Sequence, residues 1–362
     1  RCLGGISFSL DLEGAFDSVP RRELARSLRK LGVDEDCVHL LMQFHSQSRY
    51  HFSIDGHCSS VTSTRGVKQG CRVAPYLFLA LTLSIMDDLA EELGEAWLVK
   101  LFTFFADDAF ASWEIHEPQG LTNAIAGIQT VVTFFNKHGM TVSPSKCAIL
   151  VDLFGPDARK IWGKALTRRP EGLYLPINQL GRPVHLPIKK HHTYLGTVVS
   201  YRQNCTQTLA HRLTKSRGQQ AMLRKTIHAR STISRGHRFR IWRAGVFSSM
   251  VYGLQAVGLT ASGAAQLRST IARQLRAITG QAAHLTHIPN SVVRQQLGCQ
   301  EVTAMLLQQV RQHLSKLERV AQLDPRDIRC EPVAIGQLRA VAANLQGLGV
   351  SDALRPLAAD KV

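Results

Sequence analysis

The first two hundred residues combine two hydrophobic periodicities, one typical of strands and one typical of amphipathic helices. Alternation of apolar and polar positions predicts strands or hairpins at 6–12, 50–64, 101–113, 147–151 and 172–188. Apolar positions three and four residues apart predict helices over 20–31, 34–45, 76–93 and 121–138. Antiparallel hairpins with helices packed on one side indicate an α+β fold.

Beyond residue 205 the strand pattern disappears and helical periodicity continues almost to the end of the chain. The expected helices cover 211–232, 236–251, 264–279, 291–297, 302–322 and 333–348. We therefore expect an α+β domain over 1–204, a helical domain over 205–290 and a helical extension over 291–362, for which the sequence indicates no role.

Charge is distributed very unevenly along the chain. The chain has 44 Lys and Arg against 27 Asp and Glu, a formal charge of +17. Between Gly172 and Gln300 there is no acidic residue, and the same stretch holds 18 basic ones. Surface helices normally mix both signs, so a block without acids predicts a surface that binds polyanions rather than one that is merely solvated.

The cysteines and the longest apolar run exclude other classes of protein. The eight cysteines are scattered without a Cys-x-x-Cys pair, which argues against structural zinc and favours a reducing compartment. The longest apolar run, from Tyr76 to Met86, has 11 residues and is too short to cross a membrane. We expect no membrane partner.

Acidic residues stand at the ends of two predicted strands far apart in the sequence. Asp11 ends the strand at 6–12, and Asp107 with Asp108 occupies the tip of the hairpin at 101–113. An Asp-Asp pair alone is also typical of a solvated turn. If the two strands are neighbours, the three carboxylates converge and can hold two divalent ions, Mg²⁺ first and Mn²⁺ as the substitute, for a phosphoryl transfer.

Five segments in this order resemble the reverse transcriptase family, specifically its non-LTR retrotransposon branch. They are Leu10-Asp11-Leu-Glu-Gly-Ala-Phe-Asp17, Arg65-Gly-Val-Lys-Gln-Gly-Cys-Arg-Val-Ala-Pro75, Phe105-Ala-Asp-Asp108, the segment 138–146 and Tyr194-Leu-Gly196. The resemblance covers about residues 1–200. It implies an RNA-directed DNA polymerase whose right-hand palm is followed by a basic helical thumb, with RNA template, DNA primer and deoxynucleoside triphosphates as partners.

The resemblance also implies a role for each matching residue. Metal binding and catalysis would involve Asp11, Asp107, Asp108, Lys146 and the Leu12 carbonyl. Ala15, Phe16, Gln69 and Gly70 would bind the nucleotide, with the Phe16 ring rejecting a 2′-hydroxyl. Tyr194, Leu195 and Gly196 would hold the primer end. The basic residues expected to contact the nucleic-acid backbone are Arg212, Lys215, Arg224, Lys225, Arg235, Arg238 and Arg243.

Simpler structural roles exist for some of these residues. Phe16 could be core packing, Lys146 a solvated turn residue and Tyr194 a packed strand aromatic. Ala74 stands where the family usually has Ser.

Only ten residues precede Asp11. We therefore expect the fingers to be largely missing and the chain to be a piece of a longer polyprotein with an endonuclease. The isolated segment is then expected to be weak or inactive, and its localisation intracellular, in the nucleus after cytoplasmic synthesis.

Three other functions remain open from the sequence. A decayed relative could act only as a nucleic-acid-binding protein, which would not need the three acids. An RNA-dependent RNA polymerase would have to accept a 2′-hydroxyl, against which Phe16 argues. A metal-dependent nuclease could use three acids but has no need of a residue that discriminates sugars.

Overall fold

The computed structural model describes residues 3–46, 48–68, 70–323 and 332–353. The chain forms two compact units, Arg1–His192 and Thr193–Val362. The boundary expected after residue 204 falls inside the second unit. The reason is that β11 (Thr197–Val199) packs on α8 (Asn204–Met222), where Thr208 Oγ1 accepts a hydrogen bond from the Val198 amide at 3.0 Å.

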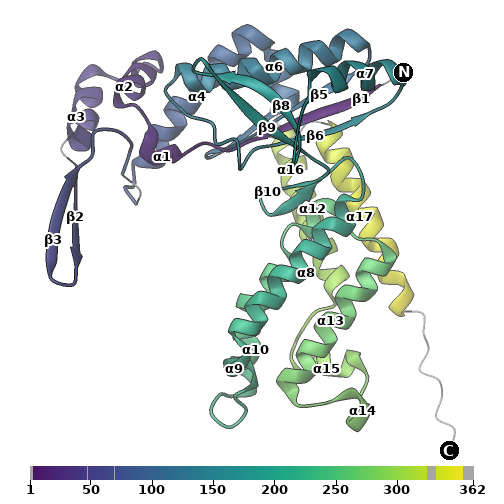
Figure 1. Cartoon of the computed structure of the whole chain (residues 1–362). Coiled ribbons are helices and arrows are strands. Elements are labelled where there is room, and N and C mark those ends of the chain that lie inside the picture. Colours follow the sequence, from purple (N-terminus) through teal and green to yellow (C-terminus); the bar gives the residue numbers. More distant parts are fainter. Residues whose placement is uncertain (1–2, 47, 69, 324–331, 354–362) are drawn as a thin grey trace, which may run out of the picture. The chain divides into compact units, whose positions relative to one another are not determined.

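A seven-stranded sheet in the order β4-β5-β1-β6-β9-β8-β7 forms the framework of the first unit (Figure 1). All neighbouring strands are antiparallel except β6 and β9, which are parallel. The strands are β1 (Gly4–Leu10), β4 (Phe102–Phe105), β5 (Asp108–Ile115), β6 (Ala148–Leu153), β7 (Thr167–Arg169), β8 (Gly172–Gln179) and β9 (Arg182–Lys189). The α+β expectation is confirmed.

Strand β1 is buried on both sides of the sheet. Ile6, Phe8 and Leu10 on one face are at most 1 % exposed and belong to the core of this unit. On the other face Ser7 is buried as well, and its hydroxyl lies 3.2 Å from that of Ser112 on β5. A buried central strand fixes the pairing register, because a slip by one residue would turn the apolar side chains to the other face.

Helices α4 and α6 pack against each other, and α6 contacts strands β5 and β8 (Figure 1). The stripe expected on 121–138 is confirmed, since Leu121, Ile128 and Phe135 on α6 are fully buried. The helices of the unit are α1 (Ala15–Ser18), α2 (Arg21–Lys30), α3 (Glu35–Ser46), α4 (Ala74–Leu93), α5 (Glu95–Leu101), α6 (Pro118–Lys137) and α7 (Pro156–Ala165).

The sequence pattern failed to predict α5 and α7. The pattern predicts a hairpin that begins at Leu101, whereas Leu101 is the last residue of α5. The apolar residues of α5 run directly into the aromatic residues of β4, and a short apolar run does not distinguish a helix from a strand.

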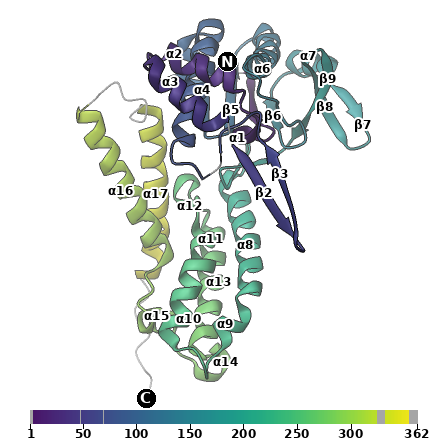
Figure 2. The ribbon, with the colours of Figure 1, turned by 90° about the vertical axis from the view of Figure 1, so that its left-hand side faces the viewer.

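A β-hairpin made by β2 (Arg49–Ile54) and β3 (His57–Thr62) projects from the first unit, as Figures 1 and 2 show. The expected turn at Asp55-Gly56 is confirmed, with φ of +51° and +81°. Positive φ at both central residues matches the twist of a two-residue hairpin. All twelve strand residues are exposed.

The described residues of the second unit are helical apart from the hairpin of β10 (His192–Tyr194), which begins at the last residue of the first unit, and β11. Its core surrounds Trp242, which is fully buried and donates from Nε1 to Gln274 Oε1 at 2.8 Å. Its helical segments after α8 are α9 (Arg224–His228), α10 (Arg235–Trp242), a π-helical turn (Arg243–Phe247), α11 (Ser248–Val251), α12 (Leu254–Val257), α13 (Ala261–Thr279), α14 (Ala283–Thr286), α15 (Asn290–Gln296), α16 (Val302–Leu323) and α17 (Pro332–Ala353).

The single helix expected over 211–232 is wrong. Helix α8 begins at Asn204 and ends at Met222, and α9 follows after Leu223. No glycine or proline marks this break, so the helical periodicity runs through it. Among the described helices of both units, none is long and apolar enough to span a bilayer.

Candidate functional site

Pairing of β1 with β5 brings the three predicted acids to one end of the sheet. Leu10 lies opposite Ala109, so Asp11, which follows β1, is next to Asp108, which begins β5. Asp107 lies in the β4–β5 turn beside Ala106, whose φ is +56°. Burial raises the pKa of Asp108, and the nearby Asp107 and Asp11 carboxylates raise it further. The sheet therefore holds like charges together, which is costly without a cation.

Lys146 is the basic partner of this carboxylate group. Its Nζ lies 3.2 Å from Asp11 Oδ1, and it is 64 % exposed while Asp11 is 27 % exposed. The turn that carries it is fixed to the acid, because the Ser143 amide donates to the Asp11 carbonyl at 2.9 Å and the Lys146 amide donates to the Ser143 carbonyl. The ammonium group is thus close to the acids and accessible from solvent.

Cys147 is a residue of this site that the sequence analysis did not identify. The Asp11 amide donates to Cys147 Sγ at 3.4 Å, and the thiol lies 3.9 Å from the Asp11 carbonyl oxygen. Burial raises the pKa of this thiol to about 12, so it stays protonated at neutral pH. The signal for it was its position directly after Lys146 at the start of a strand, where it faces the end of β1.

Carboxylates are the kind of ligand that a hard divalent cation takes, but the three acids do not form a preformed cage for one in the described structure. Asp11 Oδ1 is shielded from solvent, its ion-pair partner is the Lys146 ammonium group, and carboxylate oxygens are the ligands that Mg²⁺ and Mn²⁺ prefer. Leu12 is buried and forms an isolated bridge with Val142. Within the described ranges, however, no three His, Cys, Asp or Glu side chains form a group that could hold a metal ion.

Of the residues expected to bind the nucleotide, Ala15 and Phe16 lie on α1 and Gly70 lies in the loop before α4. Ala15 is buried, and Phe16 is half-buried with its ring stacked on Phe78 at 4.5 Å between centroids. Gly70 is exposed with φ of +86°, and Gln69 lies outside the described residues. Discrimination between sugars by Phe16 stays a prediction.

The loop between β3 and α4 is attached to α1 by its backbone. The Val67 amide donates to the Phe16 carbonyl at 2.8 Å, and the Gly66 amide donates to the Val19 carbonyl at 2.7 Å. Gly66 has φ of +83°, and a Cβ there would lie 2.5 Å from the Asp17 carbonyl oxygen. Only glycine allows the two segments to approach this closely.

In the second unit, Tyr194, Leu195 and Gly196 form the turn between β10 and β11. Leu195 and Gly196 have positive φ of +45° and +78°, and Leu195 is 37 % exposed. Arg212 donates to the Gly196 carbonyl and lies 4.4 Å from the centre of the Tyr252 ring. The turn is therefore stabilised by α8.

Arg212 and Arg238 do not have the exposed positions expected of phosphate contacts. Arg212 is 9 % exposed, and Arg238 is 5 % exposed and donates to the Ile278 carbonyl at 2.8 Å and the Ile233 carbonyl at 3.0 Å. Burial lowers the pKa of both. Burial and these backbone carbonyl partners disfavour direct phosphate contacts, and the nucleic-acid role of both residues stays a prediction. The remaining predicted residues are exposed: Lys215, Arg224, Lys225, Arg235 and Arg243.

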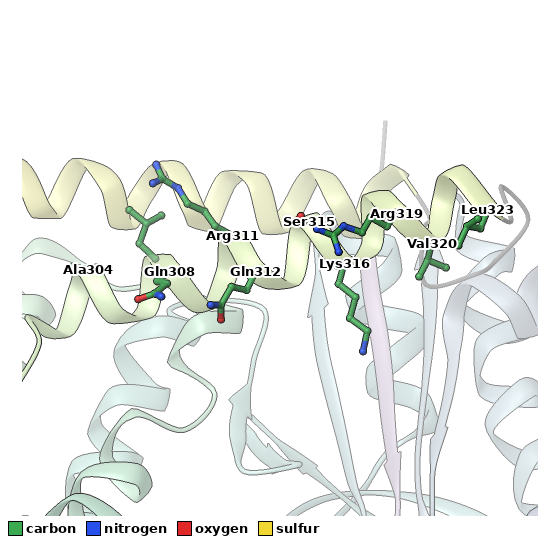
Figure 3. A pocket seen from close by; sticks show the side chains of 10 residues that line it. Ala304, Gln308, Arg311, Gln312, Ser315, Lys316, Arg319, Val320 and Leu323 are labelled. Atoms are coloured by element: carbon green, nitrogen blue, oxygen red, sulfur yellow. The ribbon is translucent and has the colours of Figure 1, made fainter.

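A groove of about 680 Å³ runs along α16 in the second unit (Figure 3). Side chains of this one helix line it, with Leu307, Val320 and Leu323 among basic residues such as Arg311, Lys316 and Arg319. None of the predicted catalytic residues belongs to it.

Comparison with known proteins agrees with the motifs. Two Pol polyproteins described as "Retrovirus-related Pol polyprotein from type-1 retrotransposable element R2", both from Popillia japonica, resemble the chain. One is 26 % identical over 262 residues, which are 70 % of this chain and 39 % of the relative. The other is 29 % identical over 146 residues, 38 % of this chain and 20 % of the relative. The chain thus spans less than half the length of these relatives.

Solved structures of two telomerases show a weaker likeness. The apo enzyme of Candida tropicalis matches 98 % of this chain and 52 % of its own at 10 % identity, with a TM-score of 0.41. The Candida albicans enzyme with a fragment of telomeric RNA matches 89 % of this chain and 49 % of its own at 11 % identity, with a TM-score of 0.29. With TM-scores this low, the similarity to the telomerases is no basis for assigning the chain to a family.

The family model described as "Reverse transcriptase (RNA-dependent DNA polymerase)" matches residues 6–199, more than half of the chain. This range includes all five motifs, and the relatives come from retrotransposable elements, as the resemblance to the non-LTR branch implied. The chain belongs to the reverse transcriptase family.

Proposed function

We propose that this chain carries the polymerase centre of a non-LTR retrotransposon and catalyses RNA-directed DNA synthesis. The observation that carries the proposal is the convergence of Asp11, Asp107 and Asp108, with Lys146 Nζ 3.2 Å from Asp11. The substrates are an RNA template, a DNA primer and deoxynucleoside triphosphates. The greater length of the related Pol polyproteins supports a role together with further domains. That one of these domains is an endonuclease and that the reaction takes place in the nucleus are parts of the proposal.

The chain's own residues would divide the work of nucleotidyl transfer. Two Mg²⁺ ions, or Mn²⁺ in their place, held by Asp11, Asp107, Asp108 and the Leu12 carbonyl would activate the primer hydroxyl and neutralise the phosphates. Lys146 has an exposed ammonium group beside Asp11 and would give a proton and positive charge to the departing pyrophosphate. Cys147 and Ser143 hold the backbone of Asp11 in position.

Substrate selection would depend on the loop attached to α1. The half-buried Phe16 ring stacks on Phe78, which fixes its position. The ring would exclude a ribose 2′-hydroxyl by steric contact. Gly70 and Gln69 would approach the incoming nucleotide. In the second unit, the turn Tyr194 to Gly196 would support the primer end.

Template-primed DNA synthesis tests this proposal. The chain within its full reading frame is incubated with primed RNA, deoxynucleotides and Mg²⁺ or Mn²⁺. Asp107→Asn should lower the extension rate by at least about 1000-fold, since charge stabilisation in the transition state is lost. Asp157→Asn, an exposed acid on α7, is the matched control and should leave the rate unchanged. An Asp107→Asn variant that extends primers as well as the wild type would refute the proposal.

A further inference from the structure

The projecting hairpin has one aromatic face that the chain does not cover. Tyr50 and Phe52 on β2 point to the same side as Val61 on β3, because Tyr50 is paired with Val61 and successive residues of a strand alternate. These side chains are 38 %, 51 % and 56 % exposed. The opposite face carries Arg49, His51 and Ser53 with their partners and is polar.

The aromatic face leads into a cavity of about 440 Å³ at the base of the hairpin. Tyr50 and Phe52 line it on the side of the hairpin. The rest of the wall is formed by Ser63, Arg65, Gly66 and Val67 of the following loop and by Asp17 of α1. The cavity therefore begins at the hairpin and ends at Asp17, the last residue of the first motif, and at Gly66 and Val67 in the second. This volume is within the range of small-ligand sites.

Arg21 on α2 fixes the shape of this cavity. It donates to the Ser63 carbonyl at 2.8 Å, to Ser63 Oγ at 3.1 Å and to the Gly66 carbonyl at 3.3 Å. Burial lowers the pKa of its guanidinium group, whose hydrogen bonds go to Ser63 and Gly66. The cavity is therefore held by hydrogen bonds before any ligand arrives.

The charge around the hairpin favours a nucleic acid over an acidic or a purely apolar partner. From residue 49 to residue 72 there are four basic residues, Arg49, Arg65, Lys68 and Arg72, and one acid, Asp55. Arg65 lines the cavity itself. Asp17 also lines the cavity. Its negative charge disfavours a phosphate inside, so the group that enters would be a base.

We infer that this hairpin binds unpaired bases of a single-stranded nucleic acid, which stack on Tyr50 and Phe52. Two aromatic residues at same-face positions of a strand are a recurring platform for single-stranded bases, and stacking tolerates any sequence. The inference depends on the proposed function, because it identifies the strand as template that has not yet reached the polymerase centre. The loop that borders the cavity is hydrogen-bonded to the proposed nucleotide site, because the Val67 amide donates to the Phe16 carbonyl.

Fluorescence anisotropy with the 362-residue chain separates this inference from the proposed function, because it measures binding without synthesis. The probes are two labelled primer–template duplexes, one blunt and one with an unpaired 5′ template extension. We expect the extension to strengthen binding, and a Tyr50→Ala/Phe52→Ala variant to lose about 10-fold or more in affinity for the extended duplex only. The matched control, His51→Ala on the opposite face, should retain the full preference.

Two further measurements make the outcome decisive. Tyr50→Phe/Phe52→Tyr should restore the preference for the extended duplex, since it keeps both rings. The thermal midpoint of the alanine variant should match the wild type, because both side chains are exposed. Equal loss of affinity for both duplexes, no loss, or a change of oligomeric state in sedimentation without a change in binding would overturn the inference. Failure of primer extension alone would affect only the proposed function.

Discussion

Leu10 lies directly opposite Ala109 across β1 and β5. This single pairing brings an acid that follows one strand next to an acid that begins another, although 97 positions separate Asp11 from Asp108 in the sequence. Because β1 is buried and paired on both sides, the register cannot slip by one residue without turning Ile6, Phe8 and Leu10 away from the core that they pack in. The stability of the sheet therefore maintains the proximity of the carboxylates.

Asp108→Asn should stabilise the metal-free protein at neutral pH. Burial and the Asp107 and Asp11 carboxylates raise the pKa of Asp108 above its ordinary 3.8, so its ionisation opposes folding. The penalty is absent below the ordinary pKa, grows as the pH rises from there towards the raised value and stays constant above it. We expect a gain of about 1–3 °C in thermal midpoint at pH 7 that disappears near pH 3. A gain that persists at pH 3, or a loss at pH 7, would contradict the assigned cause.

Cys147→Val should slow synthesis through the backbone of Asp11. Valine removes the sulfur that accepts the Asp11 amide, which leaves a buried donor without a partner at a cost of about 1–3 kcal/mol. We expect kcat to fall about 10-fold with KM unchanged, whereas Cys147→Ser should keep most of the activity. Steady-state extension kinetics measure both constants. The control is Cys37→Val at an exposed position, and equal kinetics for Val and Ser at position 147 would show that the thiol has no positioning role.

Arg212 and Lys215 should respond differently to salt. Lys215→Ala removes an exposed charge, so it should reduce the slope of log affinity against log salt by about 1. Arg212→Lys removes the stacking on Tyr252 and weakens the bond to Gly196, so it should lower stability by about 1–3 kcal/mol and leave the salt slope intact. Salt titrations of nucleic-acid binding and urea unfolding give the two quantities. A reduced salt slope for Arg212→Lys would return this residue to the nucleic-acid contacts.

Gly66→Ala should be much more damaging than Gly56→Ala. Both glycines have φ near +80°, so both substitutions introduce backbone strain of about 1 kcal/mol. Only Gly66 has a neighbour, the Asp17 carbonyl oxygen, 2.5 Å from the added Cβ, whereas nothing lies within 4 Å at Gly56. Urea unfolding should show at least about 1 kcal/mol of additional loss for Gly66→Ala. Equal losses would mean that the close approach of the loop to α1 is unimportant.

The sequence allowed prediction of those features that depend on local pattern. The Asp55-Gly56 turn, the buried alternation of β1 and the stripe on α6 each have a strong short-range signal. The site acids could be identified because each stands at the end of an apolar strand, where a carboxylate contributes little to core packing. That Asp11 lies near Asp107 and Asp108 depends on which strands are neighbours in the sheet. The alternation of apolar and polar residues does not reveal this order.

Features that depend on long-range contacts could not be predicted in this way. Helical spacing placed Arg212 and Arg238 on a basic surface, but their backbone carbonyl partners lie on other elements. Cys147 resembles an ordinary apolar strand residue until β6 is paired with β1. The division at residue 192 follows from the packing of β11 on α8, which no composition change marks.

Iron-directed cleavage tests the central claim most directly, namely that Asp11 and the Asp107–Asp108 pair bind the same cations. Fe²⁺ replaces Mg²⁺ in the 362-residue chain, and ascorbate with peroxide generates hydroxyl radicals that cut the backbone near the bound ion. We predict cuts close to residues 11 and 107–108, suppressed by excess Mg²⁺, and a joint loss of both in Asp11→Asn. Cuts near 107–108 that are unchanged in Asp11→Asn, or cleavage at only one of the two segments, would contradict a shared site.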